Sequence, residues 1–263
     1  MTSAQPPKGH VDALTGVRAF AAGWVVLYHV WLLSGKEPIT LHTSGLTMDF
    51  TPIISMGWFG VDVFFVLSGF VLTWQALRQS RSAPQLTPAN FGRYYGEFIH
   101  RRVLRVYPAY YACLAVLLPL AWLHVYGNPP DFADVALHLV MFHNVAGDYV
   151  STINGVFWSL PFEWQFYLLF PLLVLLILRG QTLWLLLLGI TASAVSKIIV
   201  LSGGPASHSA LLLAQLPMRL DAFVLGMVAA KMAYGWRRDS HWRVWSFWIG
   251  AFGLVGAAEY FAQ

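Results

Sequence analysis

Charged residues are scarce in this sequence, and that scarcity decides its class. Only 11% of the 263 residues are Asp, Glu, Lys or Arg, whereas a soluble domain usually carries about 25%. An ordinary water-soluble globule is therefore a poor fit. Intrinsic disorder fits no better, because aromatic residues alone make up 16% of the chain. With 57% hydrophobic residues and a mean hydropathy of +0.59, the composition indicates a polytopic membrane protein.

Cysteine and the common catalytic motifs are also nearly absent. The single cysteine, Cys113, excludes an intrachain disulfide and a multi-cysteine metal site. No nucleophile elbow, Walker loop or Rossmann glycine pattern occurs in the sequence. His138 and His143 are five residues apart, which puts them on different faces of a helix, so we predict no metal site. The net charge of +4 fits the orientation signals of a membrane protein, and we expect no nucleic-acid partner.

Long apolar runs are what the sequence has in abundance. A spanning helix needs about 20 mostly apolar residues, and seven segments approach that length. Segment 133–147 is shorter and predicts an interfacial or re-entrant helix, and the polar stretch from Gln79 to Glu97 predicts a loop. We therefore expect an all-α, polytopic transmembrane helical bundle. Its predicted spans are 13–33, 56–77, 100–123, 155–178, 182–201, 208–232 and 243–262.

Positive charge predicts the orientation of this bundle. With a cytoplasmic N-terminus and seven spans, most of the 16 Lys and Arg residues fall on the cytoplasmic side, as the positive-inside rule requires. The polar N-terminus lacks a basic region followed by an apolar one, so we expect no cleaved signal peptide. The chain ends directly after an apolar run, which leaves both a natural terminus and a truncation open.

Ionisable residues inside the apolar segments indicate where function is concentrated. A charge near the bilayer centre costs roughly 2.5–3.5 kcal/mol, so each needs a partner, water or a function. Arg18 and His29 are eleven residues apart and lie on one helix face, about 16 Å from each other along the axis. A hydrogen-bonded core histidine and a lined cavity are both open interpretations of His29. The full set is Arg18, His29, Asp62, Glu163, Lys197, Arg219 and Asp221.

Three pairs within predicted helices suggest specific chemistry. Glu163 and Tyr167 share a face, where a carboxylate suits proton transfer, although a buried ion pair with an arginine explains Glu163 equally well. Asp62 and Gly69 also share a face. Gly69 permits the close approach of a ligand or of another helix, and both alternatives stay open.

The third pair lies at a predicted cytoplasmic helix start. Arg102 and Arg105 are i,i+3 neighbours, and two guanidinium groups match the oxygens of a phosphate group. Arginines are common at the cytoplasmic ends of membrane helices even without a ligand, so a role in membrane orientation alone is a strong alternative to phosphate binding.

Five stretches in order resemble the membrane-bound acyltransferase-3 family, whose members O-acetylate sugars on bacterial cell surfaces. They are Leu14 to Ala22 with Arg18 and the later His29, the glycine-punctuated run 60–70, the Arg-x-x-Arg-Val-x-Pro-x-Tyr stretch from Arg102 to Tyr110, Trp158-Ser159-Leu160 with Glu163 and Tyr167, and a weaker Arg219 to Phe223 with Gly226. The resemblance covers most of the chain and implies one integral-membrane domain over residues 1–263. The family has about ten spans, so seven would mean a truncated or short member.

The resemblance also implies an activity. The donor would be cytoplasmic acetyl-CoA, or another short acyl-CoA, and the acceptor a hydroxyl of a cell-surface or lipid-linked carbohydrate. The protein would lie in the inner membrane of a bacterium, with the lipid bilayer around it and no permanently bound cofactor. The identity of the acceptor and the oligomeric state are left open by the sequence.

Roles for single residues follow from the same resemblance. His29 would act as general base or carry the acyl group transiently, Arg18 would contact the donor or pair with Asp62, and Glu163 would orient His29 or relay its proton. Arg102 and Arg105 would bind the phosphates of the donor. The thioester arm would pass Ser68 and Gly69. The supporting residues would be Asp62, Trp158, Ser159, Tyr167 and Arg219.

Two other classes compete with an acyltransferase. Intramembrane Arg, His, Asp and Glu residues also mark proton-coupled transporters, although the two related halves common in transporters are not visible in the sequence. An inactive, truncated membrane homologue is the other alternative. Turnover of acetyl-CoA distinguishes an acyltransferase from both a transporter and an inactive homologue.

Overall fold

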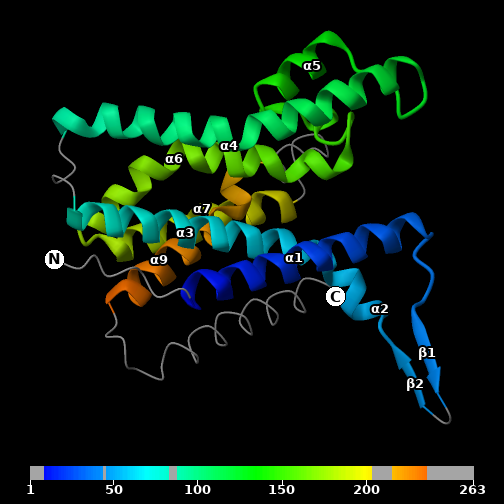
Figure 1. Cartoon of the computed structure of the whole chain (residues 1–263), viewed down its shortest axis with the longest axis horizontal. Helices are drawn as coiled ribbons and strands as arrows, with labels where there is room; N and C mark the ends of the chain where they lie inside the picture. The colour runs from blue at the N-terminus through cyan, green and yellow to red at the C-terminus, as the bar shows by residue number, and fades with distance from the viewer. Residues whose placement is uncertain (1–8, 44–45, 83–87, 203–214, 236–263) are drawn as a thin grey trace.

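The structure, a computed structural model, describes residues 9–43, 46–82, 88–202 and 215–235. Long helices that alternate in direction along the chain form a bundle, and a small hairpin and a short helix lie at one end of it (Figure 1). The long helices are α1 (Gly9–Leu33), α3 (Gly60–Ser82), α4 (Pro88–Trp122), α6 (Leu160–Leu178), α7 (Thr182–Leu201) and α9 (Leu220–Gly235). The shorter elements are β1 (Thr40–Thr43), β2 (Leu46–Asp49), α2 (Thr51–Ser55), α5 (Phe132–Leu139) and the 3-10 turns η1 (Met56–Phe59), η2 (His143–Val145), η3 (Gly147–Tyr149), η4 (Gly155–Ser159) and η5 (Leu216–Arg219).

The predicted membrane bundle is confirmed in its class and in most of its spans. Within the described part of the chain, five helical segments are long and apolar enough to cross a bilayer, and each overlaps a predicted span. The sixth predicted span, 208–232, is only partly described and overlaps α9, whereas 243–262 lies outside the described residues. The antiparallel hairpin β1–β2 is the exception to an all-α fold, and the sequence analysis did not predict it.

The predicted loop from Gln79 to Glu97 is wrong over most of its length. Helix α3 continues to Ser82 and α4 already begins at Pro88, a residue whose fixed φ suits a helix start. The polar start of α4 is held onto the bundle by aromatic residues, because Phe98 is buried and the Tyr95 hydroxyl donates to the Leu168 carbonyl at 3.0 Å. The polar composition therefore marks an amphipathic extension of a spanning helix rather than a break between two helices.

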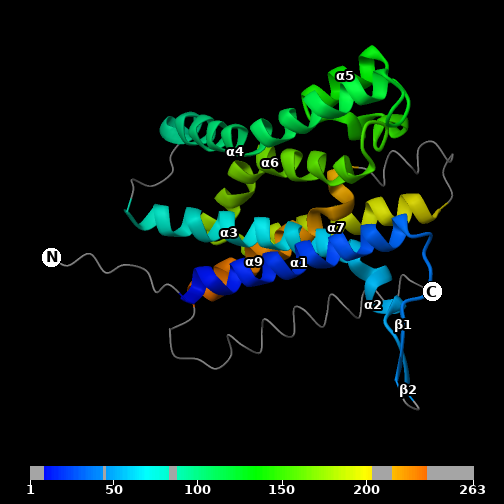
Figure 2. The same ribbon diagram turned by 45° about the vertical axis from the view of Figure 1, so that its right-hand side comes forward.

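Helix α3 occupies the centre of the bundle. It packs against α1, α9 and α6, while α4 lies beyond α6 (Figures 1 and 2). At the crossing of α3 and α9 the two backbones almost touch, since a Cβ on Gly69 would lie 2.0 Å from the Phe223 carbonyl oxygen and one on Gly226 would lie 2.0 Å from that of Val66. Small residues permit such approach between membrane helices. The rings of Phe65 and Phe223 stack beside this crossing at 4.7 Å.

Helix α1 attaches to the start of α3 through a second pair of glycines. A Cβ on Gly60 would lie 2.8 Å from the Ala21 carbonyl oxygen, and one on Gly57 would lie 2.5 Å from that of Trp24. The Trp24 indole also donates to the Ile53 carbonyl at 2.7 Å. The outer face of α1 stays exposed and apolar, with Phe20 70% exposed, as a lipid-facing helix requires.

The short helix predicted within 133–147 exists as α5, but its histidines are not placed as predicted. Helix α5 ends at Leu139, and Met141 takes a positive φ of 59°, so helical periodicity does not extend to His143. The rings of His138 and His143 stack with centroids 3.9 Å apart and planes 4° from parallel. Both side chains are fully buried, and Asp134 Oδ1 lies 2.9 Å from His138 Nδ1.

In this stacked arrangement the two rings do not converge on one ion, because the lone pairs of an imidazole lie in the plane of its ring. Among the described residues no group of three or more His, Cys, Asp or Glu side chains is arranged to hold a metal.

Replacing Gly69 with Ala should destabilise the bundle, because the added Cβ meets the Phe223 carbonyl oxygen. We expect a loss of at least about 1–3 kcal/mol, the usual cost of overpacking, measured by thermal unfolding in detergent. The control is Gly96→Ala, since Gly96 lies on α4 with open space around its Cα, and that change should stabilise the helix by up to about 1 kcal/mol. Equal melting temperatures for both variants would contradict the close crossing.

Stability should fall as the pH is lowered from 7 to 5. Burial holds the pKa of His143 at about 4, below the ordinary 6.5, and also lowers the pKa of His138. Between these values the unfolded chain binds a proton that the folded chain does not, so each pH unit removes up to about 1.4 kcal/mol of stability.

The matched variant for this effect is His143→Phe, which keeps an aromatic ring in the stack. Its melting temperature should depend less on pH between 5 and 7 than that of the unaltered chain. The same pH slope in both proteins would show that the buried pair does not control the transition.

Candidate active site

Glu163 is the carboxylate around which the sequence motifs meet. It lies in the first turn of α6, where the helix dipole favours a negative charge. Its Oε1 accepts a hydrogen bond from the Ser68 hydroxyl of α3 at 2.9 Å and a second one from the Tyr167 hydroxyl one turn further along α6. The predicted i,i+4 relation of Glu163 and Tyr167 is therefore confirmed as a direct bond. The alternative of an ion pair with an arginine, which the sequence left open, is not what the structure shows, because two hydroxyl groups bond to Glu163.

Arg102 joins the third motif to this group. Its guanidinium carbon lies 5.6 Å from the centre of the Tyr167 ring and 5.3 Å from that of Phe98, both within cation–π range. Its Nε is buried and has no hydrogen-bond partner within the described residues. Three motifs that are far apart in the sequence thus converge on Glu163 through Ser68, Arg102 and Tyr167.

A second polar group lies between α3, α7 and the start of α9. One nitrogen of Arg219 donates to both oxygens of Asp62, at 3.1 and 3.3 Å, and Lys197 donates to Asp221 at 2.8 Å. The sequence analysis paired Asp62 with Arg18, and that pairing is wrong. The reason is the register of α1 against α3. Ala21 is the residue of α1 that contacts the start of α3, at Gly60, whereas η5 brings Arg219 to Asp62.

His29 and Arg18 both lie on α1 and stand apart from the Glu163 group. His29 Nδ1 lies 2.7 Å from the carbonyl oxygen of Val25 on the same helix. Because a carbonyl only accepts, Nδ1 carries the hydrogen, and in the neutral ring Nε2 then has the lone pair that a general base needs. No hydrogen bond joins His29 to Glu163 in the described part of the chain, so the predicted orienting contact is absent from this structure.

The remaining predicted site residues take peripheral or packing positions. Gly69 faces α9, which fills the space that a ligand would need, so the structure favours its packing interpretation. Arg105 is exposed on α4. Trp158 packs edge-on against Phe162 with centroids 5.7 Å apart, and Ser159 precedes the first residue of α6.

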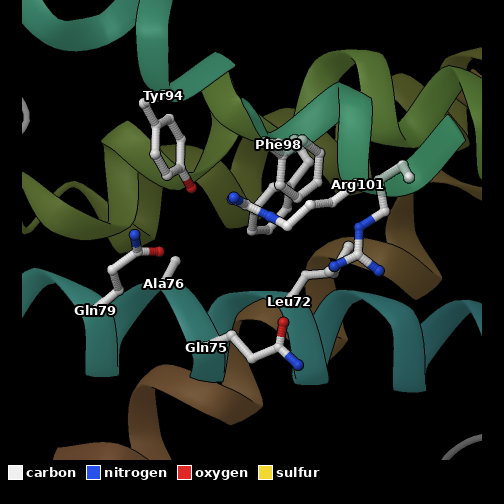
Figure 3. Close-up of a pocket in the computed structure, with 9 residues that line it drawn as sticks. Leu72, Gln75, Ala76, Gln79, Tyr94, Phe98 and Arg101 are labelled. Carbon is white, nitrogen blue, oxygen red and sulfur yellow. The ribbon is translucent and has the colours of Figure 1, made fainter. Parts of the chain in front are cut away.

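Sequence reasoning missed an amide cluster that ties the outer turns to the bundle. Asn144 is fully buried, its side-chain oxygen accepts from Gln165 at 3.0 Å, and its backbone carbonyl accepts from Gln215. It also missed that Arg101, rather than Arg105, lies with Arg102 on a cleft between α3, α4 and α6 (Figure 3). The available signal for the amide cluster was Gln165, an amide within an apolar helix. No feature of the sequence motif distinguished Arg101 from Arg105 as a residue of the cleft.

The pair of Asp62 and Arg219 should behave as a unit. Asp62→Leu or Arg219→Met leaves one charge without its partner, and we expect each to lower the free energy of unfolding by roughly 2–3 kcal/mol, below the loss for a fully buried pair because Arg219 keeps a side-chain exposure of 30%. The double variant should lose clearly less than the sum. Thermal unfolding of all three variants in detergent checks this, and additive losses would count against the coupling.

Comparison with known proteins identifies the family of this chain. The acyltransferase-3 profile, described as an acyltransferase domain, matches residues 11–263. The chain is 30% identical over 248 residues to the acyltransferase MdmB of Streptomyces mycarofaciens, covering 86% of this chain and 58% of that protein. It is 28% identical over 182 residues to the peptidoglycan O-acetyltransferase OatA of Listeria monocytogenes, covering 65% and 25%.

A similar enzyme name recurs in a further relative. The O-acetyltransferase OatA of Staphylococcus aureus is 26% identical over 186 residues, covering 65% of this chain and 26% of that protein. No solved structure matches the chain significantly. The chain thus spans little more than half of the length of MdmB and about a quarter of either OatA. Since the family profile covers almost all of the sequence, the chain belongs to the acyltransferase-3 family of membrane proteins.

Proposed function

We propose that this protein is an O-acyltransferase that moves a short acyl group from acyl-CoA to a carbohydrate hydroxyl. The observation that carries the proposal is the convergence of three motifs on Glu163, beside a cleft lined by two arginines. The name of one relative, the peptidoglycan O-acetyltransferase of Listeria monocytogenes, supports a sugar polymer as the acceptor class.

The donor side of the reaction is assigned to the Glu163 group. Ser68 and Tyr167 are held by their bonds to Glu163, and the Arg102 guanidinium lies over the Tyr167 ring. Each hydroxyl uses its single hydrogen in the bond to Glu163, so the Arg102 guanidinium is the donor that can bind a thioester carbonyl and the negative charge that develops on its oxygen. In this proposal Glu163 fixes the Tyr167 ring on which that guanidinium lies, which replaces its predicted role as a partner of His29.

The acceptor side is assigned to His29. Its Nε2 takes the proton of the acceptor hydroxyl as the hydroxyl oxygen attacks the thioester carbonyl. Collapse of the tetrahedral intermediate breaks the carbon–sulfur bond, and the CoA thiolate leaves and takes up the proton. Direct transfer and a transient acyl-His29 differ only in whether the nucleophile of the first step is the hydroxyl or Nε2. Arg18, on the same helix, would contact the donor.

The proposed orientation places the arginine-rich end of the bundle in the cytoplasm of a bacterium. The ends of α3 and α6 and the start of α4 lie together, opposite the hairpin β1–β2 and α5 (Figure 1). Arg78, Arg93 and Arg179 belong to that shared end, which agrees with the positive-inside rule for the inner membrane. The cleft with Arg101 and Arg102 then receives a cytoplasmic donor.

One observation favours a second candidate, a proton-coupled transporter. The ion pairs of Asp62 with Arg219 and of Lys197 with Asp221 lie within apolar helices or at their ends, as in proton pathways. Substrate flux without release of free CoA would support that function.

The test is release of free CoA from acetyl-CoA by the purified chain in detergent. We expect slow release from the unaltered protein and a rate at least about 100-fold lower for His29→Ala, the usual contribution of a general base. His124→Asn is the control, because His124 is an exposed turn residue with a φ of 56° that asparagine tolerates. Equal rates for the unaltered protein and His29→Ala would remove His29 from the chemistry.

A further inference from the structure

The hairpin of β1 and β2 has one apolar and one polar face. In its antiparallel register Leu41 pairs with Met48 and Thr43 pairs with Leu46, and paired residues lie on the same face of a sheet. Successive residues of a strand point to opposite faces. The other face therefore holds the alternate residues, Thr40, His42, Thr47 and Asp49. An antiparallel sheet with such alternation usually rests its apolar face on another surface.

The two faces differ in how their side chains are satisfied. On the polar face the His42 ring nitrogens lie 3.0 Å from the Thr47 hydroxyl oxygen and 3.1 Å from that of Thr40. On the apolar face Leu41, Leu46 and Met48 keep between 45% and 52% of their surface exposed. A two-stranded hairpin is at best marginally stable in water unless its apolar face packs on something. These three side chains therefore need a cover.

The hairpin connects two membrane-spanning segments. The first segment ends at Leu33 and the next begins at Thr51, so only Phe50 stands between the end of β2 and the second segment. On the other side, the Trp31 indole donates to the Glu37 carbonyl at 2.9 Å, which folds the link before β1 back onto α1. The base of the hairpin therefore lies at the level where α1 leaves the bilayer.

The surface beside that base is a surface for lipid. Val26, Leu27, Val30 and Leu33 are all more than half exposed, and they continue to the last residue of α1. Exposed apolar side chains on a spanning helix face the acyl chains of the bilayer. In Figures 1 and 2 the hairpin projects sideways from this end of the bundle, across the direction of the long helices. Its strands therefore run along the plane of the membrane surface.

The backbone of the hairpin limits how deep it lies. The sheet has two strands in the described part of the chain, so the outer edge of each strand presents N–H and C=O groups that no strand pairs. Such groups do not enter the hydrocarbon core but can meet water and lipid headgroups. Between Thr40 and Asp49 the sequence has no Lys or Arg, so attraction to anionic lipids is not needed for this contact.

We propose that the hairpin lies flat on the bilayer surface, with Leu41, Leu46 and Met48 inserted between the headgroups and the polar face turned to the solution. Its partner is a lipid surface, and neutral lipids suffice. In the proposed orientation this is the outer surface of the inner membrane. The placement of the hairpin does not depend on the proposed acyl transfer.

Fluorescent labels on the two faces test this placement. In a Cys113→Ala background, Met48→Cys provides a labelling position on the apolar face, and Thr47→Cys is the matched control on the polar face. Leu46→Cys repeats the apolar position nearer the turn. Each protein carries a nitrobenzoxadiazole label and is placed in phosphatidylcholine nanodiscs that hold one chain each. A lipid with a nitroxide near its headgroup quenches inserted labels, and iodide quenches labels in water.

The labels of Met48→Cys and Leu46→Cys should emit at shorter wavelength than that of Thr47→Cys, lose most of their fluorescence to the nitroxide lipid and resist iodide. The label of Thr47→Cys should show the reverse, with circular dichroism of each protein unchanged. Equal quenching by iodide on both faces would overturn the proposal, because the apolar face would then be in water when no second copy is present. Resistance of the apolar face to both quenchers would also overturn it, because protein rather than lipid would then be the cover.

Discussion

The contact between Gly69 of α3 and the backbone of α9 is the constraint on which the rest of the bundle depends. A Cβ at Gly69 or Gly226 would lie 2.0 Å from a carbonyl oxygen of the other helix, so the two helices have one register and one separation at that point. Once α3 is fixed at this crossing, the directions of its other side chains are fixed as well. Ser68 is turned to Glu163, Asp62 to Arg219, and Leu72 and Gln75 to the cleft.

Most charged groups inside the bundle have a polar partner, because an unpaired charge is costly in a medium of low dielectric constant. Glu163 receives two hydroxyl donors, Asp62 receives Arg219, and Asp221 receives Lys197. Apart from Tyr167, which shares α6 with Glu163, each partner comes from a different element, so the pairing also fixes how α3, α6, α7 and α9 sit against one another. Arg102 is the exception, since its buried Nε has no partner among the described residues and its guanidinium rests on aromatic rings.

Much of this architecture could be predicted from the sequence because hydropathy determines the spans and local spacing determines helix faces. The segment 182–201 and the shared face of Glu163 and Tyr167 are examples. Contacts between distant segments could not be predicted, because no local pattern says which helices touch. The pairing of Asp62 with Arg219 instead of Arg18 shows this. So do His138 and His143, where the helix rule failed because a positive φ at Met141 ends the helical geometry between them.

Helix α3 is long enough to reach from one side of a bilayer core to the other. Asp62 and Gln79 are separated by about 26 Å along the helix axis, close to the roughly 30 Å of a bilayer core. One helix therefore carries the cleft near one membrane surface, Ser68 in the interior, and an ion pair toward the other surface. In the proposed reaction a donor at the cleft would reach toward the depth of Ser68 with its thioester. The acceptor hydroxyl, or His29 as a transient carrier, would have to meet the thioester carbonyl there, because the acyl group leaves sulfur only as it bonds to that nucleophile.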